Sequence, residues 1–184
     1  MLDVGLANEL KAAFRRGNWT NQEIKRLSEG DTLAQVRKVL LGHASITTFE
    51  HMVDLDADPF VPDGWSVEEH QKGGQFKWNP AAVKLYLSEP QKRGRTIEGN
   101  KLRSTFMGEP VLNANLLDYL LAKQHFIPEE WKSKYVFFWG TIYRGSGGSL
   151  YVRYLVWGDD EWRWDYDWLH GDFDGDSPAA LRTS

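Results

Sequence analysis

Cysteine is absent from this chain of 184 residues. The protein therefore forms no disulfide, carries no thiolate nucleophile and builds no cysteine-based zinc site. No run of about 18 consecutive apolar residues is present either, which is the length that a membrane-spanning helix requires. Residues 1–18 lack the basic start and unbroken apolar stretch of a signal peptide, and their two acids, Asp3 and Glu9, are untypical of a transit peptide. Together these absences predict a soluble, cytoplasmic protein that does not associate with a membrane.

Motifs that mark known catalytic and cofactor sites are also missing. The chain contains no Walker A, GxSxG, HExxH or Rossmann pattern. We therefore predict no bound cofactor, except for a divalent cation (Mg²⁺, Mn²⁺ or Ca²⁺) under one hypothesis described below. On these grounds alone the chain is not assigned to an enzyme class.

Aromatic side chains are the residues present in excess. They make up 14% of the chain, including nine Trp, while the hydrophobic (41%) and charged (26%) fractions are those of an ordinary globular protein. The net charge of −4 is unevenly distributed, because residues 158–177 contain eight acidic residues against one basic residue, Arg163. A nucleic-acid partner is disfavoured for this acidic segment, since it would repel phosphate.

The distribution of apolar residues predicts an α+β protein with a single domain, residues 1–184. Its regions in chain order are a helical subregion (1–42), a strand and hairpin region (46–90), helices (97–132), a three-stranded antiparallel aromatic β-meander packed against helices (135–169) and an acidic tail (170–184). Within the second region, two short segments are predicted to form a hairpin across the turn Lys72-Gly73-Gly74.

The helical subregion is expected to contain three short helices. Thr20 and Glu23 match a capping box, in which each side chain accepts a hydrogen bond from a free backbone amide of the other residue. Three helices in a row also fit a helix-turn-helix. A plain helical subregion is favoured, because only Arg37 and Lys38 would point outward near the centre of the third helix.

An alternation near the C-terminus is the clearest pattern in the chain. From residue 161 to 168, charged and aromatic residues alternate: Glu161, Trp162, Arg163, Trp164, Asp165, Tyr166, Asp167 and Trp168. On a strand this places the rings on one face and the charges on the other. Most rings are expected to be core, because each buries about 150 to 250 Å². A few are predicted to line a binding groove, namely Trp162, Trp164 and Trp168. Asp165 and Asp167 lie on the other face, so they could add polar contacts to the groove only around the edge of the strand.

A second group of residues has the composition of a metal site. It comprises His51, Asp54, Asp56 and Asp58, to which Glu69 and His70 of the following hairpin could be added. Carboxylates on one face of a strand, with an imidazole nearby, suit a hard divalent cation. The alternative is that these acids cap turns and hydrate a loop.

Alternating acids recur at Asp172, Asp174 and Asp176, which resembles the spacing of a calcium loop. The segment lacks the correctly placed Gly and the final bidentate Glu of an EF-hand loop. We therefore expect an exposed acidic turn. The one concentrated group of basic residues is the loop Lys92-Arg93-Gly94-Arg95, which suits either a phosphate group or a solvated surface.

Several sequence segments along the chain are the basis of a resemblance to a protein family. They are HMVDLDADPFVPDGW, KGGQFKWNP, TIEGNKLR, PVLNANLLDYLL, IPEEWKSKYVFFWGTIYR and DGDSPAALR. In these strings the chain resembles a family of small uncharacterised bacterial proteins, over most of its length after about residue 19. The resemblance implies a bacterial, free-standing, single-domain protein. It implies no activity and no functional residues.

Three functional hypotheses follow. The favoured one is a non-enzymatic binding or protein-interaction module, which holds a protein or a small ligand on an aromatic sheet face with an acidic rim. The second is a metal-dependent hydrolase built on His51, Asp54, Asp56 and Asp58. The third is a nucleic-acid binder that uses the N-terminal helices and the basic loop. The first is favoured because aromatic residues are in excess beside charge of one sign and no catalytic set is complete.

Overall fold

The computed structural model describes residues 3–46 and 50–183. It divides into two compact units, residues 1–49 and 50–184, where the sequence predicts one domain. Each unit is described by itself. In both units, none of the described helices has the length and apolar character needed to cross a membrane.

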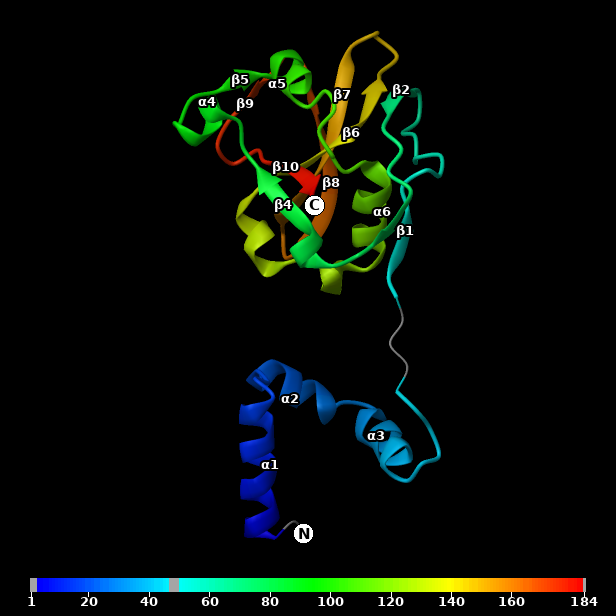
Figure 1. The fold of residues 1–184 in the computed structure, drawn as a ribbon, viewed down its shortest axis with the longest axis vertical. Coiled ribbons are helices and arrows are strands. Elements are labelled where there is room, and N and C mark those ends of the chain that lie inside the picture. The colour runs from blue at the N-terminus through cyan, green and yellow to red at the C-terminus, as the bar shows by residue number, and fades with distance from the viewer. Residues whose placement is uncertain (1–2, 47–49, 184) are drawn as a thin grey trace. The chain divides into compact units, whose positions relative to one another are not determined.

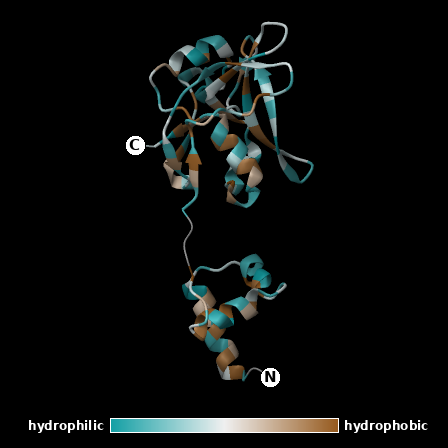
Figure 2. Cartoon of the chain, turned by 90° about the vertical axis from the view of Figure 1, so that its right-hand side faces the viewer, coloured by the Kyte–Doolittle hydropathy of each residue, from teal (hydrophilic) through white to brown (hydrophobic). Residues whose placement is uncertain are grey.

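Three amphipathic helices form the first unit. They are α1 (Val4–Arg16), α2 (Asn21–Leu27) and α3 (Thr32–Leu40). The predicted capping box is confirmed, because the Glu23 amide donates to Thr20 Oγ1 over 3.2 Å and the Thr20 amide donates to Glu23 Oε2 over 2.6 Å. No residue in these helices is buried, and hydrophobic residues alternate with hydrophilic ones along them (Figure 2).

The second unit combines a six-stranded sheet, two small two-stranded sheets and short helices, so the predicted α+β class is confirmed. Its strands are β1 (Met52–Asp54), β2 (Ser66–His70), β3 (Gln75–Lys77), β4 (Val83–Tyr86), β5 (Ile97–Glu98), β6 (Val136–Arg144), β7 (Leu150–Gly158), β8 (Glu161–Trp168), β9 (Asp172–Phe173) and β10 (Ala179–Arg182). Its helices are α4 (Glu89–Lys92), α5 (Gly99–Thr105) and α6 (Ala114–Ala122), with 3-10 turns η1 (Pro80–Ala82), η2 (Gln124–Phe126) and η3 (Glu129–Ser133).

The predicted meander is present as β6, β7 and β8, which pair antiparallel in sequence order. Strand order in the main sheet is β4-β10-β6-β7-β8, with β2 also paired to β6, so β8 is an edge strand. Both faces of this sheet carry core residues. Val136, Phe138 and Leu155 pack with the leucines of α6 on one face, and Phe137, Trp139 and Val152 pack with Phe173 on the other. Strands that are apolar on both faces, as β6 is, are therefore covered on both sides.

The C-terminal segment differs from its expected form as an acidic tail. It contains β10, which lies antiparallel to β4 and bridges parallel to β6 at Ala179 and Phe137 (Figure 1). Ala179, Ala180 and Leu181 are buried in the core. The acids of the segment precede this strand, so the last residues complete the sheet.

The predicted hairpin across Lys72, Gly73 and Gly74 is wrong. Strand β2 pairs with β6, and β3 pairs with β1. The backbone at Gly73 lies so close to Leu55 that an added Cβ would be 2.8 Å from its Cδ1 atom. The turn therefore packs down on the residues after β1 and separates the two strands.

Candidate functional site

The aromatic residues of β8 share the face of the sheet that α6 covers. Each lies opposite a β7 residue on that face: Trp162 opposite Trp157, Trp164 opposite Leu155, Tyr166 opposite Arg153 and Trp168 opposite Tyr151. The exposure of these side chains increases along the strand, from 5% at Trp162 to 45% at Trp168. Only the C-terminal half of β8 therefore offers rings to a ligand.

The three tryptophans predicted to bind a ligand have three different environments. Trp162 lies in the core, with its ring 5.5 Å from that of Trp157. Trp164 is half-buried against the guanidinium of Arg153. Trp168 is exposed, and its ring lies 4.8 Å from that of His170.

Arg153 is a buried cation beneath this face that was not predicted from the sequence. It is 1% exposed and pairs with both carboxylate oxygens of Asp118 on α6, at 2.7 and 3.1 Å. Its guanidinium carbon lies 4.2 Å from the Trp164 ring centroid and 5.2 Å from that of Phe60. A charge in the middle of the apolar run LYVRYLVW was the available signal. Arg153 links α6, β8 and the Phe60 loop, and so holds Trp164 in place.

A connected cluster of rings, which we call the aromatic surface, comprises the exposed Tyr166 and Trp168 and the half-buried Trp65 and Tyr151. The Trp65 ring stacks on Tyr151 at 4.7 Å and meets the edge of Tyr166 at 4.8 Å. Tyr151 and Tyr166 meet at 5.4 Å, and Trp168 is the cross-strand neighbour of Tyr151. The aromatic surface therefore joins the loop before β2 to the β7–β8 edge of the sheet.

Asp165 and Asp167 lie along the free edge of β8, and together we call them the acidic edge. Asp165 Oδ1 accepts a 2.8 Å hydrogen bond from the Tyr166 amide, and Asp167 Oδ1 accepts one of 2.7 Å from the Trp168 amide. An edge strand normally presents such amides unpaired, ready to pair with another strand. The acidic edge therefore blocks strand addition at these two residues and places negative charge along the edge of the strand that carries Tyr166 and Trp168.

The pKa values of two groups at this edge are raised, first by burial and then by this negative charge. Burial raises the pKa of Asp167, the hydrogen bond from the Trp168 amide partly offsets this rise, and the neighbouring Asp165 adds to it. Burial likewise raises the pKa of Tyr154 to about 12, with smaller contributions from Asp165 and Asp167. A cation at this edge would lower both pKa values, because it would stabilise the charged forms.

Tyr154 gives a prediction for alkaline solution. Its folded pKa of about 12 lies above the usual value of about 10, so the folded state keeps a proton that the unfolded state loses first. The stability contributed by this proton is complete below about pH 10 and is lost as pH rises towards about 12. Urea unfolding at several pH values should show a smaller loss of stability over this range in Tyr154→Phe than in the wild type. Identical pH profiles for the two proteins would contradict the assignment.

The residues predicted to bind a metal are not brought together. Asp54 Oδ1 accepts from the Asp56 amide at 2.9 Å, and Asp56 Oδ1 accepts from the Gly74 amide at 2.8 Å. The imidazole of His51 lies 4.3 Å from the Phe126 ring, and Asp58 is exposed. Over residues 3–46 and 50–183, no group of three or more His, Asp or Glu side chains is arranged to hold a metal ion. The acids of this segment therefore act as turn caps, which was the alternative interpretation.

His70 also has a structural role. Its Nδ1 lies 2.9 Å from Thr141 Oγ1 and its Nε2 lies 3.1 Å from the Leu55 carbonyl oxygen. Since a carbonyl only accepts, Nε2 carries the proton and Nδ1 accepts from the Thr141 hydroxyl. The ring thereby connects β2, β6 and the residues after β1.

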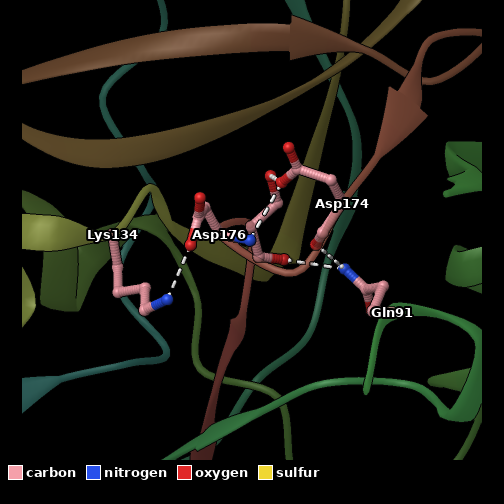
Figure 3. A network of polar contacts seen from close by, with 5 residues as sticks. Gln91, Lys134, Asp174 and Asp176 are labelled. Carbon is pink, nitrogen blue, oxygen red and sulfur yellow. Dashed lines mark hydrogen bonds and ion pairs between the residues drawn. The ribbon is translucent and has the colours of Figure 1, made fainter. Parts of the chain in front are cut away.

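The acidic turn before β10 is held by hydrogen bonds within the protein (Figure 3). Asp174 Oδ1 accepts from the Asp176 amide at 2.9 Å, while Asp176 Oδ1 accepts from Lys134 Nζ at 2.7 Å. The buried side chain of Gln91 donates to the carbonyls of Asp174 and Ser177, at 2.8 and 3.1 Å. These contacts anchor the turn to α4 and to the residues just before β6.

The basic loop is partly neutralised by its own helix. Glu89 pairs with Lys92 at 2.9 Å and with Arg93 at 3.7 Å.

Comparisons with protein-family models, curated proteins and solved structures find no match to the chain. The resemblance to a family of small uncharacterised bacterial proteins thus stays a prediction.

Proposed function

We propose that residues 50–184 form a non-enzymatic binding module that holds a positively charged peptide segment of a partner protein on the aromatic surface. The observation that carries this proposal is that the acidic edge, whose side chains start from the opposite face of β8, reaches the backbone amides of the exposed Tyr166 and Trp168 at the edge of the strand. An exposed aromatic cluster next to charge of one sign favours a ligand that combines apolar stems with opposite charge. Lys and Arg side chains have this composition.

Two attractions would act together on such a segment. A cation over an aromatic ring gains about 0.5 to 1 kcal/mol at an exposed site and about 2 kcal/mol when desolvated. Residues 158–177 also carry eight acids and one base, which attract a cationic chain over a longer range. The ring contacts provide contact energy, and the acids increase the association rate and select the sign of the partner's charge.

The acidic edge also restricts the mode of binding. A peptide that adds to a sheet edge needs free backbone amides, whereas the amides of Tyr166 and Trp168 already donate to Asp165 and Asp167. The ligand is therefore proposed to lie on the face of β8, contacting side chains. Among the described residues, no arrangement favours the metal-dependent hydrolase hypothesis.

Removal of the two exposed rings of β8 tests the proposal. The double variant Tyr166→Ala/Trp168→Ala should bind a ten-residue Lys/Arg-rich peptide at least about tenfold more weakly than the wild type, which corresponds to about 1.4 kcal/mol. Calorimetric titration measures the affinity, and binding by the wild type should weaken between about 50 and 500 mM salt because the charges become screened.

Tyr135→Ala is the matched control, because Tyr135 is equally exposed, at 46%, and lies outside the aromatic surface. This variant should retain wild-type affinity. A peptide of the same length with Glu in place of Lys and Arg should not bind. Wild-type affinity in the double variant, or equal binding of the two peptides, would refute the proposed site.

A further inference from the structure

A hollow of about 480 Å³ opens on the face of the sheet opposite the aromatic surface. It lies between α5, the loop after α5 and β2, and Trp139 of β6 also lines it. Trp139 belongs to the core cluster of Phe137 and Phe173, whereas Trp162 and Trp164, on the face of β8 that carries the aromatic surface, pack in the cluster of the α6 leucines. The hollow is therefore a second, separate location in the residue 50–184 unit.

A pair of opposite charges lines this hollow. Arg103 of α5 pairs with Glu69 of β2 in a two-pronged contact, in which Arg103 Nη2 meets Glu69 Oε1 and Arg103 Nε donates to Glu69 Oε2 at 3.3 Å. A guanidinium has five N–H groups, so Arg103 retains donors beyond the two used on Glu69. The carboxylate likewise retains acceptor sites. Hydrogen-bonding sites of both charged groups therefore remain available to a ligand.

An unpartnered buried donor lies in the same lining. Trp139 is 4% exposed, and among the described residues its indole Nε1–H has no hydrogen-bond partner. A buried N–H without a partner destabilises the protein, so an acceptor supplied by a ligand would recover stability. The neighbouring ring of Phe106, 5.4 Å from that of Trp139, adds apolar lining.

Two amide side chains complete the polar lining with acceptors. Gln71 Nε2 donates to the Glu109 carbonyl at 3.0 Å, and Asn100 Nδ2 donates to Glu98 Oε1 at 2.7 Å. Their nitrogens are thus engaged within the protein, and their carbonyl oxygens remain to accept from a ligand. The lining offers donors from Arg103 and Trp139 and acceptors from Glu69, Gln71 and Asn100.

We propose that this hollow binds a free α-amino acid with an apolar side chain, in its zwitterionic form. The α-carboxylate would accept from Arg103 and from the indole N–H of Trp139. The α-ammonium would donate to Glu69 and to the amide oxygens. The apolar side chain would contact Phe106 and Val111. A zwitterion carries a positive and a negative charge close together, as the Arg103–Glu69 pair does, so each of its charges can face a group of opposite charge. It also adds no net charge to that pair.

Calorimetric titration with L-leucine, L-phenylalanine and L-methionine, each beside its methyl ester and its N-acetyl derivative, tests this inference. The free amino acid that fits best should bind at least tenfold more tightly than both of its derivatives, since each derivative lacks one charge. In ¹⁵N-resolved NMR spectra, the Trp139 indole signal should move on titration. Equal binding of an amino acid and its derivatives, or no binding by any of the three at millimolar concentration, would overturn the proposal.

Substitutions separate this site from the rest of the molecule. Arg103→Met and Trp139→Phe should each weaken binding at least tenfold, and Arg95→Met, an exposed cation outside the hollow, should not. Melting curves identify any variant that has lost its fold, and Arg103→Met should keep it because Arg103 is partly exposed. Tyr166→Ala/Trp168→Ala should bind the amino acid normally, so failure of one proposed site leaves the other testable. Wild-type affinity in both Arg103→Met and Trp139→Phe would place the ligand elsewhere and refute the site.

Discussion

Deletion of residues 178–184 is expected to abolish the cooperative unfolding of the residue 50–184 unit. Strand β10 lies between β4 and β6, so its loss would leave two strands without their shared neighbour. The deletion would also remove acceptors for buried amides, because the Pro178 carbonyl binds the Phe137 amide and the Ala180 carbonyl binds the Leu112 amide, both at 2.9 Å. Thermal denaturation followed by near-ultraviolet circular dichroism measures the effect, and the tryptophan signal should lose its sharp transition.

Two point variants provide a graded test of the same strand. Leu181→Ala should destabilise the unit by about 2 to 4 kcal/mol, because Leu181 is 1% exposed and its truncation leaves a cavity. Arg182→Ala, at the exposed end of β10, should change stability by less than about 1 kcal/mol. If the segment were a tail outside the fold, both variants and the deletion would keep the wild-type melting temperature.

Replacement of Asp118 by Asn is expected to destabilise the unit by about 3 kcal/mol. The change keeps the shape of the side chain but leaves the buried guanidinium of Arg153 without a counter-charge, and breaking a buried ion pair in this way costs about 3 to 5 kcal/mol. The lower figure applies because the Asp118 side chain is 32% exposed and so partly screened by water. Urea denaturation gives the free energy of unfolding directly.

A double variant distinguishes a lost charge partner from lost packing. Arg153→Met/Asp118→Leu removes both charges and should recover most of the stability lost in Asp118→Asn, since apolar replacements of buried ion pairs are often neutral or stabilising. Glu89→Gln breaks the exposed pair with Lys92 and should cost less than about 1 kcal/mol. An equally small effect in Asp118→Asn would contradict the buried-pair account.

Periodicity identified the meander because β8 alternates strictly and because β6 and β7 are long and apolar. It did not identify β10, since the run Ala179 to Arg182 has no alternation and follows a stretch of acids. Its place in the sheet is fixed by partners that are far away in the sequence, namely β4 and β6. The hairpin across Gly73 was predicted wrongly for a related reason: the turn residues fit a hairpin, but packing on Leu55 directs the strands to other partners.

The sequence could predict which face of β8 carries the aromatic residues, but not which of them are exposed. Alternation places Trp162 and Trp168 on the same face, but it carries no information about how far α6 and η2 extend over that face. Trp162 lies in the core, and Gln124 of η2 donates to its carbonyl at 3.1 Å, whereas Trp168 is exposed beyond this cover. Trp65 joins the aromatic surface from a loop, and Arg153 is buried through its partner on another element. Neither position is encoded in local spacing.

The most direct test of the aromatic surface is the response of individual tryptophan indole signals to a cationic peptide. In ¹⁵N-resolved NMR titrations with a Lys/Arg-rich peptide, the indole signals of Trp65 and Trp168 should move in proportion to occupancy. Those of the buried Trp78, Trp131 and Trp162 should stay in place. Movement of the buried signals alone, or no movement of Trp65 and Trp168 at saturating peptide, would contradict the proposed binding surface.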